Sequence, residues 1–209
     1  MSRPASGTDQ RLLKAGKELL REKGVMGLSV REACRRAGVN TGMFHYYFGS
    51  KDEFLKAVLK GMYAEFFARF QMGVAEGAGP REKLKNALIA VGRFAREIKG
   101  VAPVILADVS LGNKEAFDFI SGNFLEHVKQ LSALAAQCRP QSALKAHSIP
   151  YMIGALLPTM VFPVIMGGIM ERHGVKKPGG IEFDALAAEF FSDEGIADRA
   201  EIALRGVGL

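Results

Sequence analysis

The chain has 209 residues, of which 48% are hydrophobic, and its formal net charge is +6 at pH 7. A chain of this length and apolar content can bury a substantial core, which excludes an intrinsically disordered protein. Its two cysteines, Cys34 and Cys138, form no CxxC or Cys/His metal pattern, and its start has no apolar signal segment. We therefore expect a cytoplasmic protein with no metal and no cofactor; a redox-sensitive Cys138, beside Arg139, stays open as an alternative to a structural cysteine.

Two helices are predicted before the first glycine turn. The first runs from about Asp9 to Lys23 and has an inner side of small and apolar residues, namely Leu12, Ala15, Gly16, Leu19 and Leu20. The second begins at Ser29, whose hydroxyl can accept a hydrogen bond from the backbone N–H of Glu32. The Glu32 carboxylate can reach back to Ser29, which would complete a capping box.

A glycine turn then leads into a third, very short helix. Gly38 stands where the chain must leave the second helix, a position that often needs a positive φ, and Asn40 is a good N-cap for the next helix. Residues 43–48 place Met, Phe, His, Tyr, Tyr and Phe all round this helix, unlike the i, i+3, i+4 spacing of a core helix. A second capping box starts at Ser50. Together these signals predict a helix-turn-helix whose third helix contacts DNA.

The basic residues are concentrated at the same end of the chain. Residues 1–60 contain 12 Lys and Arg against 6 Asp and Glu, which leaves 16 of the chain's 28 basic and 16 of its 22 acidic residues in 61–209. The whole excess of positive charge therefore accompanies the helix-turn-helix, as expected of a phosphate-binding unit joined to a neutral one.

This part of the chain resembles the N-terminal signature of the tetracycline-repressor (TetR) family of bacterial transcription regulators, over residues 8–62. The agreeing positions are Arg31, Glu32, Ala37, Gly38, Val39, Gly42, Tyr47, Phe48, Ser50, Lys51 and Glu53. Met43 departs from the usual Thr or Ser, Phe44 from Leu, and His45 from Tyr. The resemblance implies an all-α protein: a three-helix helix-turn-helix DNA-binding domain over 1–53, then a helical ligand-binding and dimerisation domain over 54–209.

The residues expected to contact DNA lie on or beside the second and third helices. They are Ser29, Arg31, Thr41, Gly42, Met43, His45, Tyr46, Tyr47 and Lys51. Thr41, Met43 and Tyr46 are assigned to base edges, with Met43 offering an apolar contact to a thymine methyl group. Ser29, His45, Tyr47 and Lys51 are assigned to the DNA backbone, with Lys51 assisted by its helix N-terminus. Arg31 suits either role.

The remaining chain predicts helices only, without strand alternation or an internal repeat. A long helix from Ser50 carries apolar residues as far as Phe70 and joins the two domains. Pro80 suits the first position of the next helix. The later helices are expected at about 80–99, 103–112, 114–137, 183–191 and 193–206.

The segment from Ser148 to Met170 has no charged residue and is long enough to span a membrane. Its several prolines and glycines, and its lack of aromatic belts, instead favour a helix buried between the domain core and a second subunit. We expect Pro158 and Pro163 to kink this helix and to open space for a ligand.

An effector pocket is expected where this helix faces the preceding helices. Its predicted lining is mostly apolar, from Phe94, Ile98, Phe124, His127, Met152, Leu156, Met160 and Phe162, and suits a small hydrophobic or aromatic molecule. No nucleophile motif, phosphate loop or paired histidine is present, so an enzyme is not expected.

The sequence thus predicts a homodimeric, ligand-responsive regulator, a repressor that binds a pseudo-palindromic operator and is released by its effector. The alternative is a helical ligand-binding or membrane-associated protein without DNA-binding activity.

Overall fold

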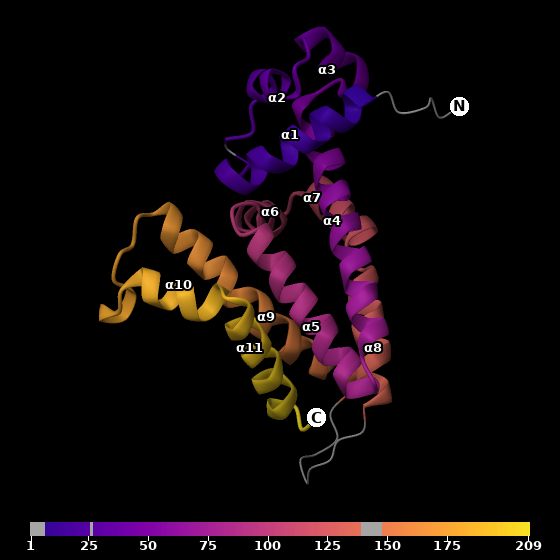
Figure 1. Cartoon of the computed structure of the whole chain (residues 1–209), viewed down its shortest axis with the longest axis vertical. Helices are drawn as coiled ribbons and strands as arrows, with labels where there is room; N and C mark the ends of the chain where they lie inside the picture. The colour runs from indigo at the N-terminus through magenta and orange to yellow at the C-terminus, as the bar shows by residue number, and fades with distance from the viewer. Residues whose placement is uncertain (1–6, 26, 139–147) are drawn as a thin grey trace. The chain divides into compact units, whose positions relative to one another are not determined.

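A computed structural model describes residues 7–25, 27–138 and 148–209, and every regular element in these ranges is helical (Figure 1). This confirms the all-α prediction. The α-helices are α1 (Gly7–Lys23), α2 (Val30–Ala37), α3 (Thr41–Phe48), α4 (Lys51–Glu76), α5 (Pro80–Glu97), α6 (Ala102–Ser110), α7 (Lys114–Asn123), α8 (Glu126–Gln137), α9 (Ile149–Arg172), α10 (Phe183–Phe191) and α11 (Asp193–Gly206), with a short 3-10 turn η1 (Pro178–Gly180).

The chain divides into two compact units, Met1–Glu65 and Phe66–Leu209. The division falls inside α4, later in the chain than the expected boundary after Glu53. Helix α4 therefore contributes its first turns to one unit and its last turns to the other.

The first unit packs α1, α2 and α3 with the start of α4. The core side chains are almost fully buried and include Leu12, Leu19, Leu20, Leu28, Phe44, Phe54 and Val58. Helix α1 approaches α4 closely at Gly16, because a Cβ there would come within 2.6 Å of Val58 and 2.7 Å of Phe54. A larger residue at Gly16 would push the two helices apart.

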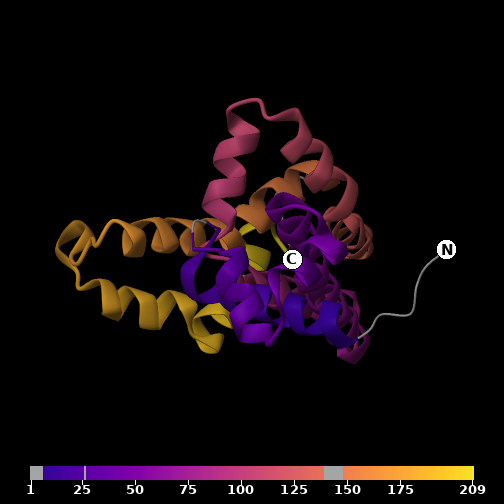
Figure 2. The same cartoon turned by 90° about the horizontal axis from the view of Figure 1, so that it is seen from above.

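The second unit is built around α5. Helices α8, α9 and α11 all pack on α5, and α11 also packs on α9. The buried residues of α5 are Leu84, Ala87, Leu88, Val91, Gly92 and Ala95. At Gly92 a Cβ would meet Ile196 at 2.7 Å and Met160 at 2.9 Å, so this glycine permits the close approach of α9 and α11. Helices α9 and α10 are joined by the connection that holds η1 and lie side by side (Figure 2).

The predicted helix over 114–137 is two helices, so that prediction is wrong. Helix α7 ends at Asn123, and α8 begins at Glu126. The apolar spacing from Phe117 to Leu131 continues through the break and hides it. The Asn123 side chain donates from Nδ2 to the backbone carbonyl of Phe119 at 2.7 Å, which satisfies a carbonyl of the last turn of α7.

Helix α9 contains Pro158 and Pro163 and continues through both. By length and composition alone it could cross a membrane. Only 39% of its most apolar window is buried within the structure. One stripe faces the core, namely Met152, Ile153, Leu156, Met160, Val164, Gly167 and Gly168. Tyr151 and Phe162 are exposed on the remaining surface, at 60% and 61% of their area.

Candidate nucleic-acid interface

The turn between α2 and α3 has the geometry that the sequence indicates. Gly38 adopts a left-handed conformation (φ 64°, ψ 41°), which a residue with a side chain rarely adopts. Its N–H donates to the carbonyl of Arg35 at 3.3 Å, and the N–H of Val39 donates to that of Cys34 at 3.0 Å. The Asn40 side chain then accepts from the backbone N–H of Met43 at 2.9 Å, so the end of α2 and the start of α3 are both capped.

The two capping boxes form only in part. Ser29 Oγ accepts from the Glu32 N–H at 3.4 Å and Ser50 Oγ from the Glu53 N–H at 3.1 Å, as expected. The Glu32 carboxylate, however, pairs with Arg35 at 2.7 Å and with Arg36 at 3.1 Å instead of returning to Ser29. Two guanidinium partners outcompete one backbone N–H for a carboxylate.

Helix α3 is fixed by one fully buried side chain. The ring of Phe44 lies 5.1 Å from that of Phe54 and 5.7 Å from that of Phe48, centroid to centroid, and Phe44 has no exposed area. Because side chains two positions away on a helix point to the other side, this anchor turns Gly42 and Tyr46 outward, while Thr41 is exposed at the first position of the helix. Tyr46 is 61% exposed.

The structure brings the expected base-contacting residues together on α3, with different exposures. Thr41 and Tyr46 are exposed, whereas Met43 is half-buried. Gly42 is exposed, and a Cβ on it would come within 3.3 Å of Asn40 Oδ1, so its bare backbone faces outward. Tyr46 and Thr41 are therefore the side chains most available for a base edge.

The residues expected to bind phosphate lie at the ends of α2, α3 and α4. Ser29 and Lys51 are exposed at the N-terminal ends of α2 and α4, where the helix dipole attracts an anion. His45 is exposed too; its Nδ1 donates to the backbone carbonyl of Gly49 at 2.9 Å, which leaves Nε2 directed elsewhere. Tyr47 is half-buried with its ring edge-on to Tyr46 at 5.1 Å.

Sequence reasoning missed two arginines of this surface. Arg35 follows the exposed Arg31 by one helical turn on α2, and 71% of its side chain is exposed although it pairs with Glu32. Arg11 Nη1 lies 4.0 Å from the position that a Cβ on Gly38 would take, so Arg11 flanks the turn. The i, i+4 spacing of Arg31 and Arg35 was a signal in the sequence that could have found the first.

The helix-turn-helix is held to α1 by a partly exposed charge network. Arg36 donates to Glu22 of α1 at 2.7 Å and to Glu32 of α2 at 3.1 Å. Hydrogen bonds from Arg35 and then from Arg36 lower the pKa of the Glu32 carboxyl to about 2. Glu32 therefore stays ionised at neutral pH and orients both arginines.

In the second unit, part of the expected effector lining forms an aromatic cluster. Phe66 stacks on Phe94 with centroids 4.4 Å apart and meets the His127 ring edge-on at 5.3 Å. Phe70 is also edge-on to His127, at 6.4 Å. Phe66 and Phe70 of α4 were absent from the expected lining, because they look like ordinary core positions of a linking helix.

The other residues expected to line the effector site do not form one continuous surface with this cluster. Leu156 and Met160 are fully buried and Met152 nearly so, and Met160 packs beside Gly92. Gly92 lies two positions from Phe94, on the other side of α5. Phe162 is corrected outright: at 61% exposure it lies on the outer surface of α9, because it follows the buried Met160 by only two positions.

Two titratable groups of the second unit are shifted by burial. Burial among the aromatic rings lowers the pKa of His127 to about 4, against an opposing hydrogen bond to the backbone of Phe124. His127 is therefore neutral at pH 7. Burial raises the pKa of the Cys138 thiol, which disfavours the reactive thiolate, and its neighbour Arg139 lies outside the described residues.

Ile98 and Phe124 each follow the last residue of a helix. Ile98 is the C-cap of α5, and Phe124, the C-cap of α7, packs its ring on Phe119 at 5.4 Å. In the described part of the chain, no three His, Cys, Asp or Glu side chains gather in a way that could hold a metal ion.

Comparison with known proteins gives a consistent result. Residues 12–58 match the model of the family described as bacterial regulatory proteins, tetR family. The repressor KstR2 of Mycolicibacterium smegmatis is 29% identical over 121 residues, which are 57% of this chain and 58% of that protein. The repressor NemR of Escherichia coli K12 is 33% identical over 72 residues, 34% of this chain and 36% of that protein. The chain thus spans about half, or less, of the length of these curated relatives.

Solved structures show the same fold over the whole chain. FadR of Bacillus halodurans, a fatty acid degradation regulator, superimposes with a TM-score of 0.67 at 15% identity and covers 98% of both chains. A transcriptional regulator from Rhodococcus sp. Rha1 gives 0.65 at 20% identity, over 96% of this chain and 98% of that one.

The fold and the site define a helix-turn-helix protein with a helical second unit. The helix-turn-helix segment, residues 12–58, matches the tetR family of bacterial regulatory proteins, and the curated relatives that the chain resembles are transcription regulators.

Proposed function

We propose that the chain is a cytoplasmic, ligand-responsive transcription repressor that binds operator DNA as a homodimer. The observation that carries the proposal is the capped α2–α3 turn, which exposes Thr41 at the start of α3 and Gly42 and Tyr46 on the side opposite the buried Phe44. Residues 1–60 of this unit carry all of the chain's excess positive charge. A short polar-aromatic helix held this way on a basic unit suits the major groove of DNA.

In this proposal α3 enters the major groove. Thr41, Tyr46 and Met43 contact base edges, and the exposed backbone at Gly42 allows close approach. The backbone contacts come from Ser29, Arg31, His45, Tyr47 and Lys51, to which we add Arg35 and Arg11. The phosphate contacts determine affinity for any duplex, and the α3 contacts determine sequence preference.

The proposal is tested by selecting binders from a library of random DNA duplexes and sequencing the bound fraction. We expect enrichment of a pseudo-palindrome whose half-site centres are about one helical turn of DNA, or a multiple, apart. A double variant, Thr41→Ala with Tyr46→Ala, is the matched control, because both side chains are exposed and their loss leaves the fold intact. Equal recovery of random sequences by the wild type would refute sequence-specific binding.

We assign the second copy of the dimer to the exposed side of α9. Tyr151 and Phe162 on α9 and Ile202 on α11 are each at least 60% exposed, an unusual concentration of large apolar side chains on a helix without charges in this part. Isologous packing of α9 and α11 on their symmetry mates would cover these side chains.

The effector site is assigned to the aromatic cluster around Phe66 and His127. Phe94, Phe124 and Ile98 contribute to it, with Met152, Leu156 and Met160 behind it in the core, so that a hydrophobic or aromatic molecule fits its chemistry. Such a ligand would release the operator only if it binds the DNA-free conformation more tightly. Titrating aromatic and aliphatic probes into the protein–operator complex, with His127→Phe for comparison, tests this assignment.

A second candidate, a membrane-associated protein without DNA-binding activity, rests on the length and composition of α9 alone. Recovery of the full chain in the soluble fraction without detergent would reject it. Recovery only from membranes would favour it over the repressor.

A further inference from the structure

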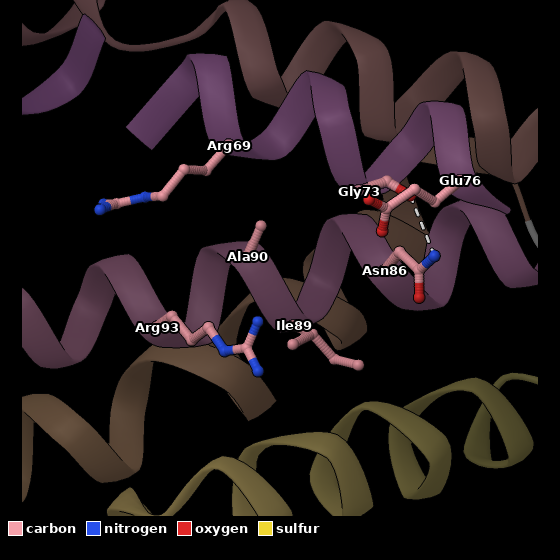
Figure 3. A pocket seen from close by; sticks show the side chains of 7 residues that line it. All are labelled: Arg69, Gly73, Glu76, Asn86, Ile89, Ala90 and Arg93. Carbon is pink, nitrogen blue, oxygen red and sulfur yellow. Dashed lines mark hydrogen bonds between the residues drawn. The ribbon is translucent and has the colours of Figure 1, made fainter. Parts of the chain in front are cut away.

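A pocket unrelated to the proposed effector site lies between α4 and α5. It has a volume of about 270 Å³, near the lower end of small-molecule sites, and is lined by Arg69, Gly73, Glu76, Asn86, Ile89, Ala90 and Arg93 (Figure 3). None of the eight residues expected to bind the effector is among them. All seven belong to the second unit.

The lining residues come from two facing stripes. On α4 they are spaced four and three residues apart, and on α5 three, one and three apart, so each set occupies one side of its helix. Small residues make the floor, because Gly73 has no side chain and Ala90 only a methyl group. A Cβ on Gly73 would meet Asn86 Cβ at 3.7 Å, an ordinary van der Waals contact, so a side chain at position 73 fits without a clash.

One end of the pocket attracts a cation. Figure 3 shows Glu76 and Asn86 together there, with Asn86 Nδ2 donating to the backbone carbonyl of Gly73 at 2.9 Å. Glu76 is the last residue of α4, a helix with no basic residue in its last turn, so its carboxylate adds to the negative end of the helix dipole. Among the described residues Glu76 forms no ion pair, and the amide Oδ1 of Asn86 can still accept a hydrogen bond.

The other end carries two guanidinium groups. In Figure 3 the Arg69 side chain extends away from Glu76, whereas the guanidinium of Arg93 turns back toward Ile89; 47% and 50% of these two side chains are exposed. Arg93 uses Nε and Nη2 for Asp193, whereas Arg69 donates from Nη2 to Glu97 at 2.8 Å. Since a guanidinium has five N–H donors, Arg69 retains donors for a second carboxylate.

We propose that this groove is a second small-molecule site, and that it binds an unbranched amino carboxylate with its ammonium group at Glu76 and its carboxylate at Arg69. Seven residues of helix separate these two positions on α4, which is about 10 Å along the axis. The apolar floor at Ile89 and Ala90 contacts the methylene chain between the two charged ends. A ligand with both charges satisfies both ends of the groove at once, whereas a ligand with one charge leaves the other end unoccupied.

Isothermal titration calorimetry on the full chain without DNA tests the proposal with three probes, 4-aminobutanoate, 6-aminohexanoate and 8-aminooctanoate. We expect the two longer probes to bind more tightly than the shortest, because only they span the groove. Hexanoate and hexylamine, each with one charged end, should bind at least about tenfold more weakly than 6-aminohexanoate. Absence of binding by all three amino carboxylates, or equal affinity for a probe with one charge, would overturn the proposal.

Two variants locate the binding. Glu76→Gln removes the charge but keeps the shape, and Gly73→Leu fills the groove while favouring the helix; both should weaken 6-aminohexanoate at least about tenfold. Glu189→Gln, an exposed carboxylate on α10, is the matched control and should bind as the wild type does. Unchanged affinity in both groove variants would place the probe elsewhere and overturn the assignment. Because no DNA is present, the result is independent of the proposed repressor function.

Discussion

The two units of the chain differ in how their candidate sites are made. In the first unit, the interface is an exposed surface whose helix ends are each capped by a nearby side chain, Ser29, Asn40 or Ser50. In the second unit, the proposed effector region is a cluster of rings from three helices, α4, α5 and α8, brought together by packing. A surface site can be specified by local sequence, whereas a cavity depends on contacts between residues far apart in the chain.

The difference extends to how firmly each site is anchored. Helix α3 is turned by the fully buried Phe44, so its outward face is determined by one contact set. Phe94 of the aromatic cluster is only half-buried, and α6 contributes no fully buried residue. We therefore expect a rigid DNA-contacting surface and a more adaptable ligand-binding region.

The largest expected effect is the loss of stability when Phe44, the buried anchor of α3, is removed. Phe44→Ala removes a side chain with no exposed area and should lower the free energy of unfolding of that unit by about 3–5 kcal/mol. Phe94→Ala, at a half-buried position, should cost clearly less. Urea denaturation followed by circular dichroism measures both losses. Equal losses would remove the contrast between the two units.

The next effect concerns pH and the second unit. Because the folded pKa of His127, about 4, lies below the unfolded value, the unfolded chain binds the proton more readily. The stability contribution is complete above about pH 6.5 and is lost as pH falls toward 4, by up to about 3 kcal/mol. Thermal unfolding between pH 7 and 4 should show this loss in the wild type and less of it in His127→Leu. Parallel curves for the two proteins would show that His127 is not the responsible group.

The third prediction concerns the surface that the second unit offers to another copy. Phe162→Arg introduces a charge at a position where the side chain is 61% exposed in one subunit. The subunit should therefore still fold, whereas the buried charge should prevent association of two subunits. Loss of the paired half-site contacts should weaken operator binding about a hundredfold, or more. Leu111→Arg, at an 86% exposed position beside α6, is the control and should remain dimeric in sedimentation velocity. A Phe162→Arg protein that sediments as a dimer would exclude this part of α9 from the interface.

A smaller effect sharpens the assignment within α3. Tyr46→Ala should lose discrimination at one base pair by about 1–2 kcal/mol, with little change in binding to random DNA. Met43→Ala should lose at most about 1 kcal/mol, because Met43 is half-buried. Competition binding with single-base operator variants measures both. A larger loss for Met43→Ala than for Tyr46→Ala would reverse the assignment.

The sequence predicted the first unit almost to the residue, since caps, a glycine turn and helix periodicity are local signals. Gly38, Asn40 and Ser50 act as expected. It also gave the bounds of α10 and α11 correctly, because Ser192 caps α11 directly after α10. The failure at Glu32 is instructive: the competing partner Arg36 is itself positioned by Glu22 on another helix.

In the second unit, the sequence predicted most of the helices but not how they pack on one another. The break between α7 and α8 was hidden by continuous apolar spacing, although Gly122 and Asn123 are residues that often end a helix. The exposure of Phe162 followed from its two-residue offset from Met160, which periodicity alone reveals once the buried stripe is known. Nothing in the sequence indicated the groove between α4 and α5, because only the fold brings Arg69 and Glu76 opposite Arg93 and Asn86.

The salt dependence of DNA binding tests the central claim most directly. Fluorescence anisotropy of a labelled duplex, titrated at several salt concentrations, gives the slope of log affinity against log salt for the wild type and for Lys51→Ala. If the first unit binds phosphates through Lys51, the variant weakens all duplexes alike and its slope is smaller by about one unit. A wild-type affinity that does not respond to salt, or an unchanged slope in Lys51→Ala, would contradict the assignment of this surface to DNA.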